Sequence, residues 1–407
     1  MVQHVGDFPL LRFAIVTLAP AICLIVAALS GGIWPWIAVI YLTGFIFVMD
    51  RLLPTDTGNI DPGSEFPATD PLLIALATLH IVILMLCIVA VAPSPALSFG
   101  QKALIAIGAG LFFGQISHPA AHELIHRNKR WLHDLGRLIY TLLLVGHHAS
   151  AHLRVHHVHV GRNDDPNSPR PGEGFYRYAL RASQQSFLAG LSAETRLRGG
   201  RVTISHPYVL YVSGSICLAV LSAWFAGAPG LVMLLFLSLY AQLQILMSDY
   251  VQHYGLQRQL LPDGEPEPVG PQHSWNAPHW FSASLMLNAP RHSDHHVSPA
   301  RTYPELQLDP GTMPMLPYPV PLMAGLALFP RLWRKIMDPR CGQWRARPWT
   351  TRPDVTAADI SPAVLAAAKS GGIPGAPLPN SDHEVDVDTP VRQPANTGGK
   401  PRRNERG

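Results

Sequence analysis

The sequence predicts an all-α membrane protein with six transmembrane helices and a histidine-rich region on the cytoplasmic side of the membrane. Of its 407 residues, 48% are hydrophobic and only 14% are charged, a balance that indicates a membrane protein rather than the two or three soluble domains expected for this length. Several apolar stretches approach the length of a bilayer span. The twenty histidines are the anomaly of the composition, because imidazole is a frequent ligand of zinc, copper and iron.

Six apolar stretches are close to the roughly 20 residues that a helix needs to cross a bilayer. The first run lacks a basic segment and a cleavage site before the next apolar stretch, so we interpret it as a retained span. Only Ser30, Gly31 and Gly32 separate the first two stretches, and Ala226 to Gly230 join the last two, so each pair is expected to form a hairpin. The stretches are Leu10 to Leu29, Ile33 to Met49, Pro71 to Val91, Lys102 to Pro119, Tyr208 to Phe225 and Leu231 to Tyr250.

Lysine and arginine residues set the expected orientation, because they accumulate in short cytoplasmic loops. Arg51 follows the second span and Arg258 follows the sixth, whereas the opposite loops carry almost nothing basic beyond Lys102. We therefore expect both termini to be cytoplasmic. The basic residues that follow the fourth span are Arg127, Lys129, Arg130, Arg137, Arg154 and Arg162.

Two further segments are not expected to cross the bilayer. The apolar piece Leu135 to Val145 is too short to span and follows a basic stretch, so it should be interfacial or re-entrant. Residues 353–407 are rich in proline, glycine and charge and are expected to be a disordered tail. Residues 1–340 would then form one transmembrane and catalytic domain.

The four cysteines exclude a thiolate metal site. Cys23, Cys87, Cys217 and Cys341 lie far apart and form no C-x-x-C pair, so any metal ion must be held by other residues. No feature of the chain predicts a nucleic-acid partner.

The first histidine group, His122-Glu123-Leu124-Ile125-His126, places two imidazoles one helical turn apart, where both can reach one metal ion. The motif alone is ambiguous. H-E-x-x-H is also the zinc-peptidase signature, in which the glutamate activates water.

Two later groups repeat this helical spacing. His152, His156 and His157 form the second group, in which three imidazoles can converge. His292, His295 and His296 have the spacing i, i+3, i+4, which places three imidazoles on one helical face. A single His253 follows the sixth span. The nine candidate ligands are His122, His126, His152, His156, His157, His253, His292, His295 and His296.

Nine imidazoles suit two metal ions, because a catalytic zinc site takes only three protein ligands. Iron fits oxygen chemistry best with such ligands, although the spacing leaves zinc, copper and manganese open. A zinc peptidase would leave most of the histidines unused. A metal transporter would place its ligands within the spans, near the bilayer midplane, whereas these histidines follow the ends of predicted spans.

With these motifs the chain resembles the membrane alkane monooxygenases, within the wider fatty acid desaturase and hydroxylase superfamily. The likeness extends from the first span to about Pro339. It rests on the following segments: His122-Glu-Leu-Ile-His126, His152-Leu-Arg-Val-His156-His157 with Asp165-Pro166 behind it, Tyr250-Val-Gln-His253-Tyr-Gly-Leu256, His273-Ser-Trp-Asn276 and Arg291-His-Ser-Asp-His-His296.

The resemblance implies a di-iron catalytic centre held by the same nine histidines at the cytoplasmic ends of six transmembrane helices. It implies O2-dependent hydroxylation of medium-chain n-alkanes to primary alcohols. It also implies a rubredoxin or ferredoxin-type electron donor with its reductase, and a multi-pass location in the bacterial inner membrane. A desaturase, or a hydroxylase of an alkyl aromatic or fatty acyl chain, would use similar ligands and remains an alternative.

The chain departs from the family pattern at the carboxylates beside the ligands. Ala151 and Gln252 stand where the family usually has glutamate, and such groups orient imidazoles and raise their basicity. The acidic residues that would compensate are Glu123, Asp165, Asp249 and Asp294. Ala289-Pro290 also replaces a polar pair ahead of Arg291, and the proline should break the approaching helix.

An alkane has no polar handle, so bulky residues of an apolar channel would set how far the chain enters. Tyr41 and Phe45, one turn apart on the second span, are candidates for this role, and ordinary helix packing is the alternative. The basic loop residues would steer an acidic electron carrier to the cytoplasmic face, but positive-inside topology explains the same charges.

Overall fold

The structure is a computed structural model that describes residues 8–64, 66–261 and 264–345. Within these ranges the chain forms helices and isolated β-bridges, and no β-strand occurs among the described residues. The all-α fold class predicted from the sequence is confirmed. The tail predicted over residues 353–407 lies outside the described residues.

Among the described residues, five helices are long and apolar enough to cross a membrane. The first four correspond to the first four predicted spans, while the predicted fifth and sixth spans both fall within the last helix, so the count of six remains a prediction. The first is α1 (Phe8–Ser30); the second joins α2 (Trp34–Ile40), η1 (Tyr41–Phe45) and α3 (Ile46–Leu52); the third joins α4 (Thr69–Met85) and η2 (Leu86–Val91); the fourth joins α5 (Phe99–Phe112), η3 (Phe113–Ser117) and α6 (His118–Ile125); the fifth is α11 (Pro207–His253).

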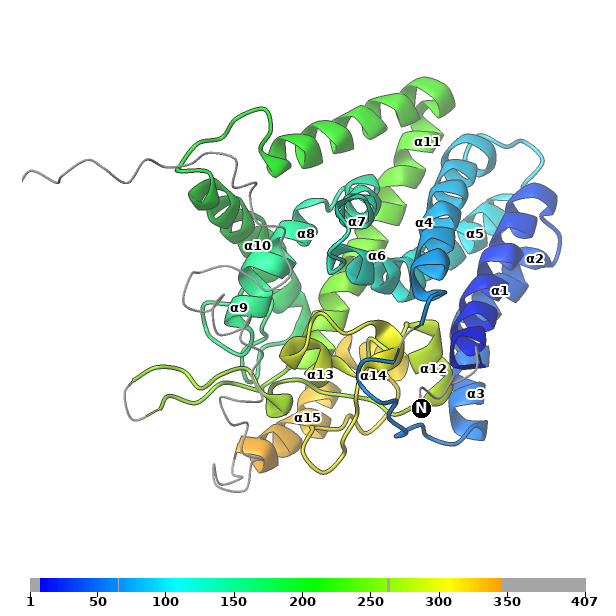
Figure 1. Cartoon of the computed structure of the whole chain (residues 1–407). Coiled ribbons are helices and arrows are strands. Elements are labelled where there is room, and N and C mark those ends of the chain that lie inside the picture. Colours follow the sequence, from blue (N-terminus) through cyan, green and yellow to red (C-terminus); the bar gives the residue numbers. More distant parts are fainter. Residues whose placement is uncertain (1–7, 65, 262–263, 346–407) are drawn as a thin grey trace, which may run out of the picture.

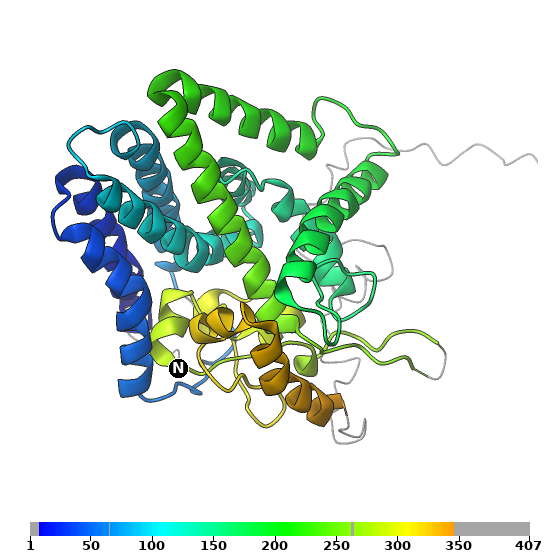
Figure 2. The same cartoon turned by 180° about the vertical axis from the view of Figure 1, so that it is seen from behind.

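Helix α11 bends sharply at Gly227 (Figures 1 and 2). This glycine alone leaves helical conformation, with φ 64° and ψ −161°, a region open to glycine because it has no Cβ. Pro229 follows within the same helix and cannot donate a backbone hydrogen bond. The bend lies within the segment Ala226 to Gly230, which was predicted to join the last two spans, and a single residue makes it. The predicted turn between the first two spans is confirmed, with Gly31 and Gly32 at φ 60° and 61°.

Four segments are π-helical, and three of them lie inside the apolar helices, namely η1, η2 and η3. Proline explains the position of η3. Pro119 has no N–H to donate to the carbonyl four residues earlier, so the helix departs from α-helical hydrogen bonding just before it. The fourth segment, η4 (His152–His156), lies in the second histidine group.

Glycine allows α11 to pack closely on the fourth apolar helix. A Cβ atom added at Gly114 would lie 2.6 Å from the Gln244 Cβ. The Gln244 Nε2 donates to the Gly110 carbonyl at 2.8 Å. Small residues at this spacing let helix backbones approach where no hydrophobic effect drives association.

Shorter helices surround the ends of α6 and α11, and α12 to α15 lie in the lower half of Figure 1. Helix α7 has 13 residues and is not among the helices long enough to span, as expected for the apolar piece at Leu135. The shorter helices are α7 (Arg130–Leu142), α8 (His147–Ala151), α9 (His157–His159), α10 (Phe175–Leu197), α12 (Trp280–Leu285), α13 (His292–Val297), α14 (Val320–Ala327) and α15 (Pro330–Arg345), with the 3-10 turns η5 (Pro271–His273) and η6 (Tyr303–Glu305).

Polar contacts tie these segments to the spans. The Asp50 carboxylate at the end of α3 accepts hydrogen bonds from the backbone N–H groups of Phe281 and Ser282, at 3.1 and 2.9 Å. It thereby caps the start of α12, whose first N–H groups have no partner within the helix. Asp70 at the start of α4 pairs with Arg127 at 3.3 Å, just after α6.

The buried Arg291 guanidinium holds the loop after α3 against the segment that carries the third histidine group. Its Nη1 donates to the Asn59 side chain at 3.0 Å and to the Leu306 carbonyl at 2.8 Å, while its Nη2 donates to the Gly58 carbonyl at 2.9 Å. Arg291 directly precedes α13, so these bonds fix where that helix begins.

We predict that Gly114→Ala destabilises the protein by about 1–3 kcal/mol, because the new methyl group would meet a Cβ atom that side-chain rotation cannot move. The matched control is Gly44→Ala, also in a π-helical segment, where the new Cβ has no atom within 4 Å. The control should hold or raise stability by up to about 1 kcal/mol. Thermal unfolding in detergent measures both, and equal melting temperatures would contradict the close packing of α11.

Candidate metal centre

Nine histidine side chains lie in two adjacent groups near the ends of α6 and α11. Within each group, one ring nitrogen of every member lies within 4.8 Å of those of the others. The structure therefore brings together all nine histidines singled out from the sequence. The five-histidine group contains His122, His126, His152, His157 and His295, and the four-histidine group contains His156, His253, His292 and His296.

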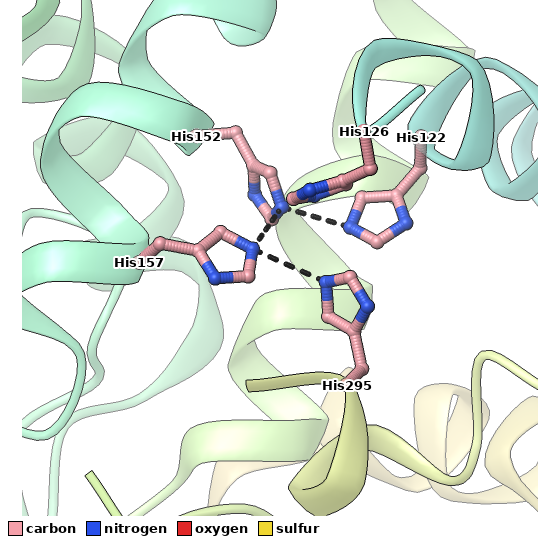
Figure 3. A group of neighbouring side chains, drawn as sticks. All are labelled: His122, His126, His152, His157 and His295. Carbon is pink, nitrogen blue, oxygen red and sulfur yellow. Dashed lines mark hydrogen bonds between the residues drawn. The ribbon is translucent and has the colours of Figure 1, made fainter. Parts of the chain in front are cut away.

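Four segments that are distant in sequence supply these side chains. Helix α6 carries His122, and His126 directly follows it. The segment of η4 and α9 supplies three histidines, the last residue of α11 is His253, and the short helix α13 supplies three more. Figure 3 shows the five-histidine group, with rings from α6, η4, α9 and α13 pointing toward a common centre.

In the five-histidine group the ring nitrogens face one another in a chain of short contacts (Figure 3). The His152 Nε2 lies 2.8 Å from the His122 Nε2 and 2.9 Å from the His157 Nε2. The His157 Nε2 lies 3.1 Å from the His295 Nε2. The His126 Nε2 is buried without a hydrogen-bond partner.

The four-histidine group has the same character. The His292 Nε2 lies 3.0 Å from the His253 Nε2 and 3.1 Å from the His296 Nε2. The His156 ring lies 4.8 Å from the His253 ring and 4.9 Å from the His296 ring, measured between centroids. Its Nε2 is buried and has no partner.

The division into groups differs from the expectation that each sequence cluster converges as a unit. His156 and His157 are adjacent, yet they belong to different groups, and His295 leaves its neighbours in α13 for the five-histidine group. The π-helical η4 accounts for the first case. A π-helix has wider turns with i→i+5 bonding, so His152 meets His157 rather than His156.

This arrangement fits metal ions. Metal–nitrogen bonds of about 2.0–2.1 Å, at the angles usual for four to six ligands, place neighbouring nitrogens roughly 3 Å apart, which is the spacing found here. The buried Nε2 atoms of His126 and His156, one in each group, lack the hydrogen bonds that buried polar atoms require, and a cation at the centre of each group would supply the missing partner. The donor set is all imidazole, which suits iron, copper or zinc.

Burial keeps most of these imidazoles neutral, as metal binding requires. Desolvation, and then neighbouring imidazoles, lower the pKa of His152, His157 and His295 well below the ordinary value. The same causes lower the pKa of His292 and His296. Neutral rings are the form that donates an electron pair to a metal.

Asp165 orients a candidate ligand. Its Oδ2 lies 2.8 Å from the His156 Nδ1, and its carboxylate also accepts from the Ser168 hydroxyl at 2.7 Å and the Asn167 N–H at 3.0 Å. Burial alone would lower the pKa of His156, but the carboxylate beside it raises the value. A carboxylate on Nδ1 fixes the tautomer that points Nε2 into the four-histidine group.

A backbone group orients His253. The His253 Nδ1 lies 3.4 Å from the His273 carbonyl oxygen, and His273 in turn pairs with the Glu267 carboxylate at 2.9 Å. The sequence analysis noted His273 only as part of a motif and missed Glu267, because no local spacing relates either residue to His253.

The other three predicted carboxylates form hydrogen bonds and ion pairs with groups other than the nine histidines. Glu123 accepts from the Tyr303 N–H at 3.2 Å and pairs with Arg127. Asp249 accepts from the Asn167 side chain at 2.6 Å. Asp294 pairs with Arg301 and accepts from the Gln307 N–H at 2.9 Å. Glu123 and Asp249 nevertheless line a small pocket beside His122 and His292.

The two departures from the family pattern are both buried. Ala151 is followed directly by η4. Gln252 accepts a hydrogen bond from the Ser248 hydroxyl at 2.8 Å and donates to the Ala289 carbonyl at 2.9 Å. The amide is thus held by α11 and by the turn before α13. As expected, no helix runs through Ala289-Pro290, since α12 ends at Leu285.

Further buried polar rings adjoin the five-histidine group, and the sequence analysis did not single them out. The His118 Nδ1 lies 2.9 Å from the Tyr140 hydroxyl, and the His148 ring stacks on His152 with centroids 5.3 Å apart. His148 belongs to the same histidine-rich segment as His152, but the spacing of the histidines did not indicate that its ring would stack on His152.

Tyr41 and Phe45, proposed as channel residues, pack on each other with ring centroids 5.1 Å apart. Both also contact the Phe281 ring of α12, at 6.1 and 5.4 Å. The Tyr41 hydroxyl donates to the Val16 carbonyl at 3.1 Å. Neither lines the two cavities found among the described residues, so the channel role stays a prediction.

Most of the basic residues expected at this end pair with carboxylates. Arg137 contacts Asp134 at 2.7 Å, Arg154 contacts Glu194 at 3.8 Å and Arg162 contacts Asp164 at 2.9 Å. Arg130 is the most exposed of them. These contacts neither require nor exclude a docking partner.

Comparison with known proteins agrees with the site. Residues 101–318 match the fatty acid desaturase family. Alkane 1-monooxygenase 2 of Pseudomonas aeruginosa is 31% identical over 75% of this chain and 84% of its own length. Alkane 1-monooxygenase 1 of Alcanivorax borkumensis is 31% identical over 80% of this chain and 82% of its own. The xylene/toluene monooxygenase hydroxylase component of Pseudomonas putida is 24% identical over 83% and 90% of the two chains.

We predict about two metal ions per chain, since the histidines form two groups. His295→Ala removes a member of the five-histidine group only, so the metal content should fall to about one ion while the other group keeps its own. His133→Ala, outside both groups and paired with Asp134, is the control. Elemental analysis of the purified protein tests this, and loss of both ions from a folded His295 variant would contradict two separate sites.

Asp165→Asn should weaken the metal ion of the four-histidine group by roughly 10–100-fold, because the amide no longer polarises His156. The ion held by the five-histidine group should be unaffected, which separates this effect from general unfolding. Asp164→Asn is the control, because the neighbouring carboxylate is half exposed and contacts Arg162. Competition with a chelator measures both affinities. Equal loss of the two ions would show that Asp165 supports the fold rather than one ligand.

Proposed function

Because the chain belongs to the fatty acid desaturase family, and within it to the alkane 1-monooxygenases, we propose that it hydroxylates medium-chain n-alkanes at the terminal carbon. The overall reaction would consume the alkane, O2, two electrons and two protons, and would release a primary alcohol and water. The observation that carries this proposal is the pair of histidine groups, buried beside apolar helices of an integral membrane protein.

Two iron ions, held by the nine histidines, would activate O2 for insertion into a carbon–hydrogen bond. The neutral imidazoles would bind these ions, and Asp165 would hold His156 in the binding tautomer. The buried walls around the groups would exclude water, which protects a reactive site from side reactions. No substrate proton needs to be removed by a side chain, so the chain's contribution is binding and positioning.

The electrons would come from a small carrier, rubredoxin or a ferredoxin-type protein, with its reductase. Such a carrier has to approach the end of the bundle that holds the histidines, where the basic residues also gather. By the positive-inside rule, this end of the protein and both termini would face the cytoplasm. The membrane would be a bacterial inner membrane. The exposed Arg130 offers one charge for an acidic carrier.

An alternative substrate is an alkyl aromatic compound, and one observation favours it: the similarity to the xylene/toluene monooxygenase component extends over 83% of this chain. A zinc peptidase fits less well. In that class the glutamate of H-E-x-x-H activates water, whereas Glu123 is held by Arg127 and by the Tyr303 N–H. A zinc peptidase would also leave most of the other seven histidines unused.

Reduced membranes that contain the protein, a competent electron donor and 18O2 should convert n-alkanes to primary alcohols that carry the label. The rate should depend on the nine histidines, so that His292→Ala abolishes product while His133→Ala does not. An alkyl benzene and a fatty acid are tested in parallel. Labelled aromatic alcohol as the main product would favour the alternative, and no labelled product from any substrate would refute oxygenase activity.

A further inference from the structure

A cavity of about 650 Å³ lies between α5, α10, α11 and α14. This volume is in the usual range for small-molecule sites. Its walls are mostly apolar, with Leu111 from α5, Phe175 from α10, Leu243 and Met247 from α11, and Val320 from α14. We call it the α10–α14 groove.

The outer end of the groove opens among exposed apolar side chains. Leu180 of α10 is 66% exposed, Leu239 of α11 is 58% exposed and Leu328 after α14 is 42% exposed. The Tyr176 hydroxyl donates to the Leu328 carbonyl at 3.0 Å and so joins α10 to α14 at this opening. Exposed leucines beside a membrane-spanning helix are the surface that lipid covers.

The inner end of the groove adjoins the small pocket at the histidines. Ser248 lines the groove and also lines the small pocket formed by His122, His152, His292 and His295. Its hydroxyl donates to Gln252, which is held in turn by the Ala289 carbonyl. The Ser248–Gln252 pair therefore stands between the groove and the five-histidine group.

We propose that the α10–α14 groove admits the apolar substrate sideways from the lipid and holds it with the reacting end at Ser248. This inference rests on the proposed hydroxylase function and gives it a substrate site. The shared lining residue Ser248 carries this inference, because a substrate that fills the groove would have its inner end beside the histidine pocket.

The lining identifies the chemistry of the occupant. None of the groove residues carries a charge, and burying a carboxylate without a partner is strongly unfavourable. The Gln244 amide nitrogen is already bonded to the Gly110 carbonyl. The part of the substrate that lies inside the groove is therefore an uncharged hydrocarbon chain.

Gly325 provides a way to fill the groove without disturbing the fold. It lines the groove on α14, and a Cβ added there has no atom within 4 Å. Gly325→Trp should raise the apparent KM for n-alkanes about tenfold or more, as expected when a hydrophobic pocket loses room. Gly342→Trp on α15 is the matched control, because its Cβ also meets open space but the residue does not line the groove. Metal content and melting temperature confirm that both variants fold.

A photoreactive alkane, an alkyl diazirine, tests occupancy without turnover on the full-length protein in lipid nanodiscs. We expect labelled peptides from α10, α11 and α14, displaced by unlabelled n-alkane and lost in Gly325→Trp but not in Gly342→Trp. Labelling around Tyr41 and Phe45 instead would overturn the inference, and so would groove labelling that excess phospholipid removes but alkane does not.

These results separate the two levels of the proposal. If the wild-type protein hydroxylates alkanes but Gly325→Trp leaves KM and labelling unchanged, the groove is not the substrate site although the function stands. If no alcohol forms from any substrate while alkane still displaces the label from the groove, the hydroxylase proposal fails and the hydrocarbon site stands.

Discussion

Nine imidazoles packed against one another, on seven buried and two partly buried residues, are the constraint on which the rest of this structure depends. Buried polar groups without partners are costly, and the His126 and His156 Nε2 atoms have none. Metal ions would relieve this cost, so the centre and the fold around it would stabilise each other. The contacts around the histidines then all help to hold the two groups in place. Arg291 fixes the start of α13, Asp50 caps α12, and Asp165 orients His156.

A change in helix type divides the histidines between the two groups. If residues 152–156 were α-helical, His152 and His156 would lie on the same face, and the two contacts that His157 makes, with His152 and with His295, would be lost. The π-helical turn instead directs His157 to His152 and frees His156 for His253 and His296. π-helical turns are rare and occur often at functional sites.

Helical spacing and apolar length are local properties, so the sequence was sufficient to predict the all-α class and the nine histidines that the structure brings together. Asp165 was one of four candidate carboxylates, and it is the one that contacts a candidate ligand. It could not predict the division of His156 from His157, which depends on a single extra residue in one helical turn. Glu267 and the His273 carbonyl were missed because a loop, not a helix, brings them to His253. The place of the bend at Gly227 was predicted, but not that a single residue makes it, since glycine and proline mark loops and bends alike. Glu123 and Asp249 line the pocket at the histidines, but the hydrogen bonds of Glu123, Asp249 and Asp294 go to groups other than the nine histidines.

The end of the bundle opposite the histidines is built from very short connections, namely the turn at Gly31 and Gly32, the capped start of α5 and the one-residue bend of α11 at Gly227 (Figure 1). So little chain on that side leaves almost no surface for a partner to recognise. Polar and apolar reactants would then reach the site by different routes. Protons, electrons and water would pass through the end that carries the shorter helices. The hydrocarbon substrate would enter from the hydrocarbon core of the bilayer. An enzyme built in this way needs no polar passage from one side of the bilayer to the other, and it would leave the membrane's ion gradients intact while it works.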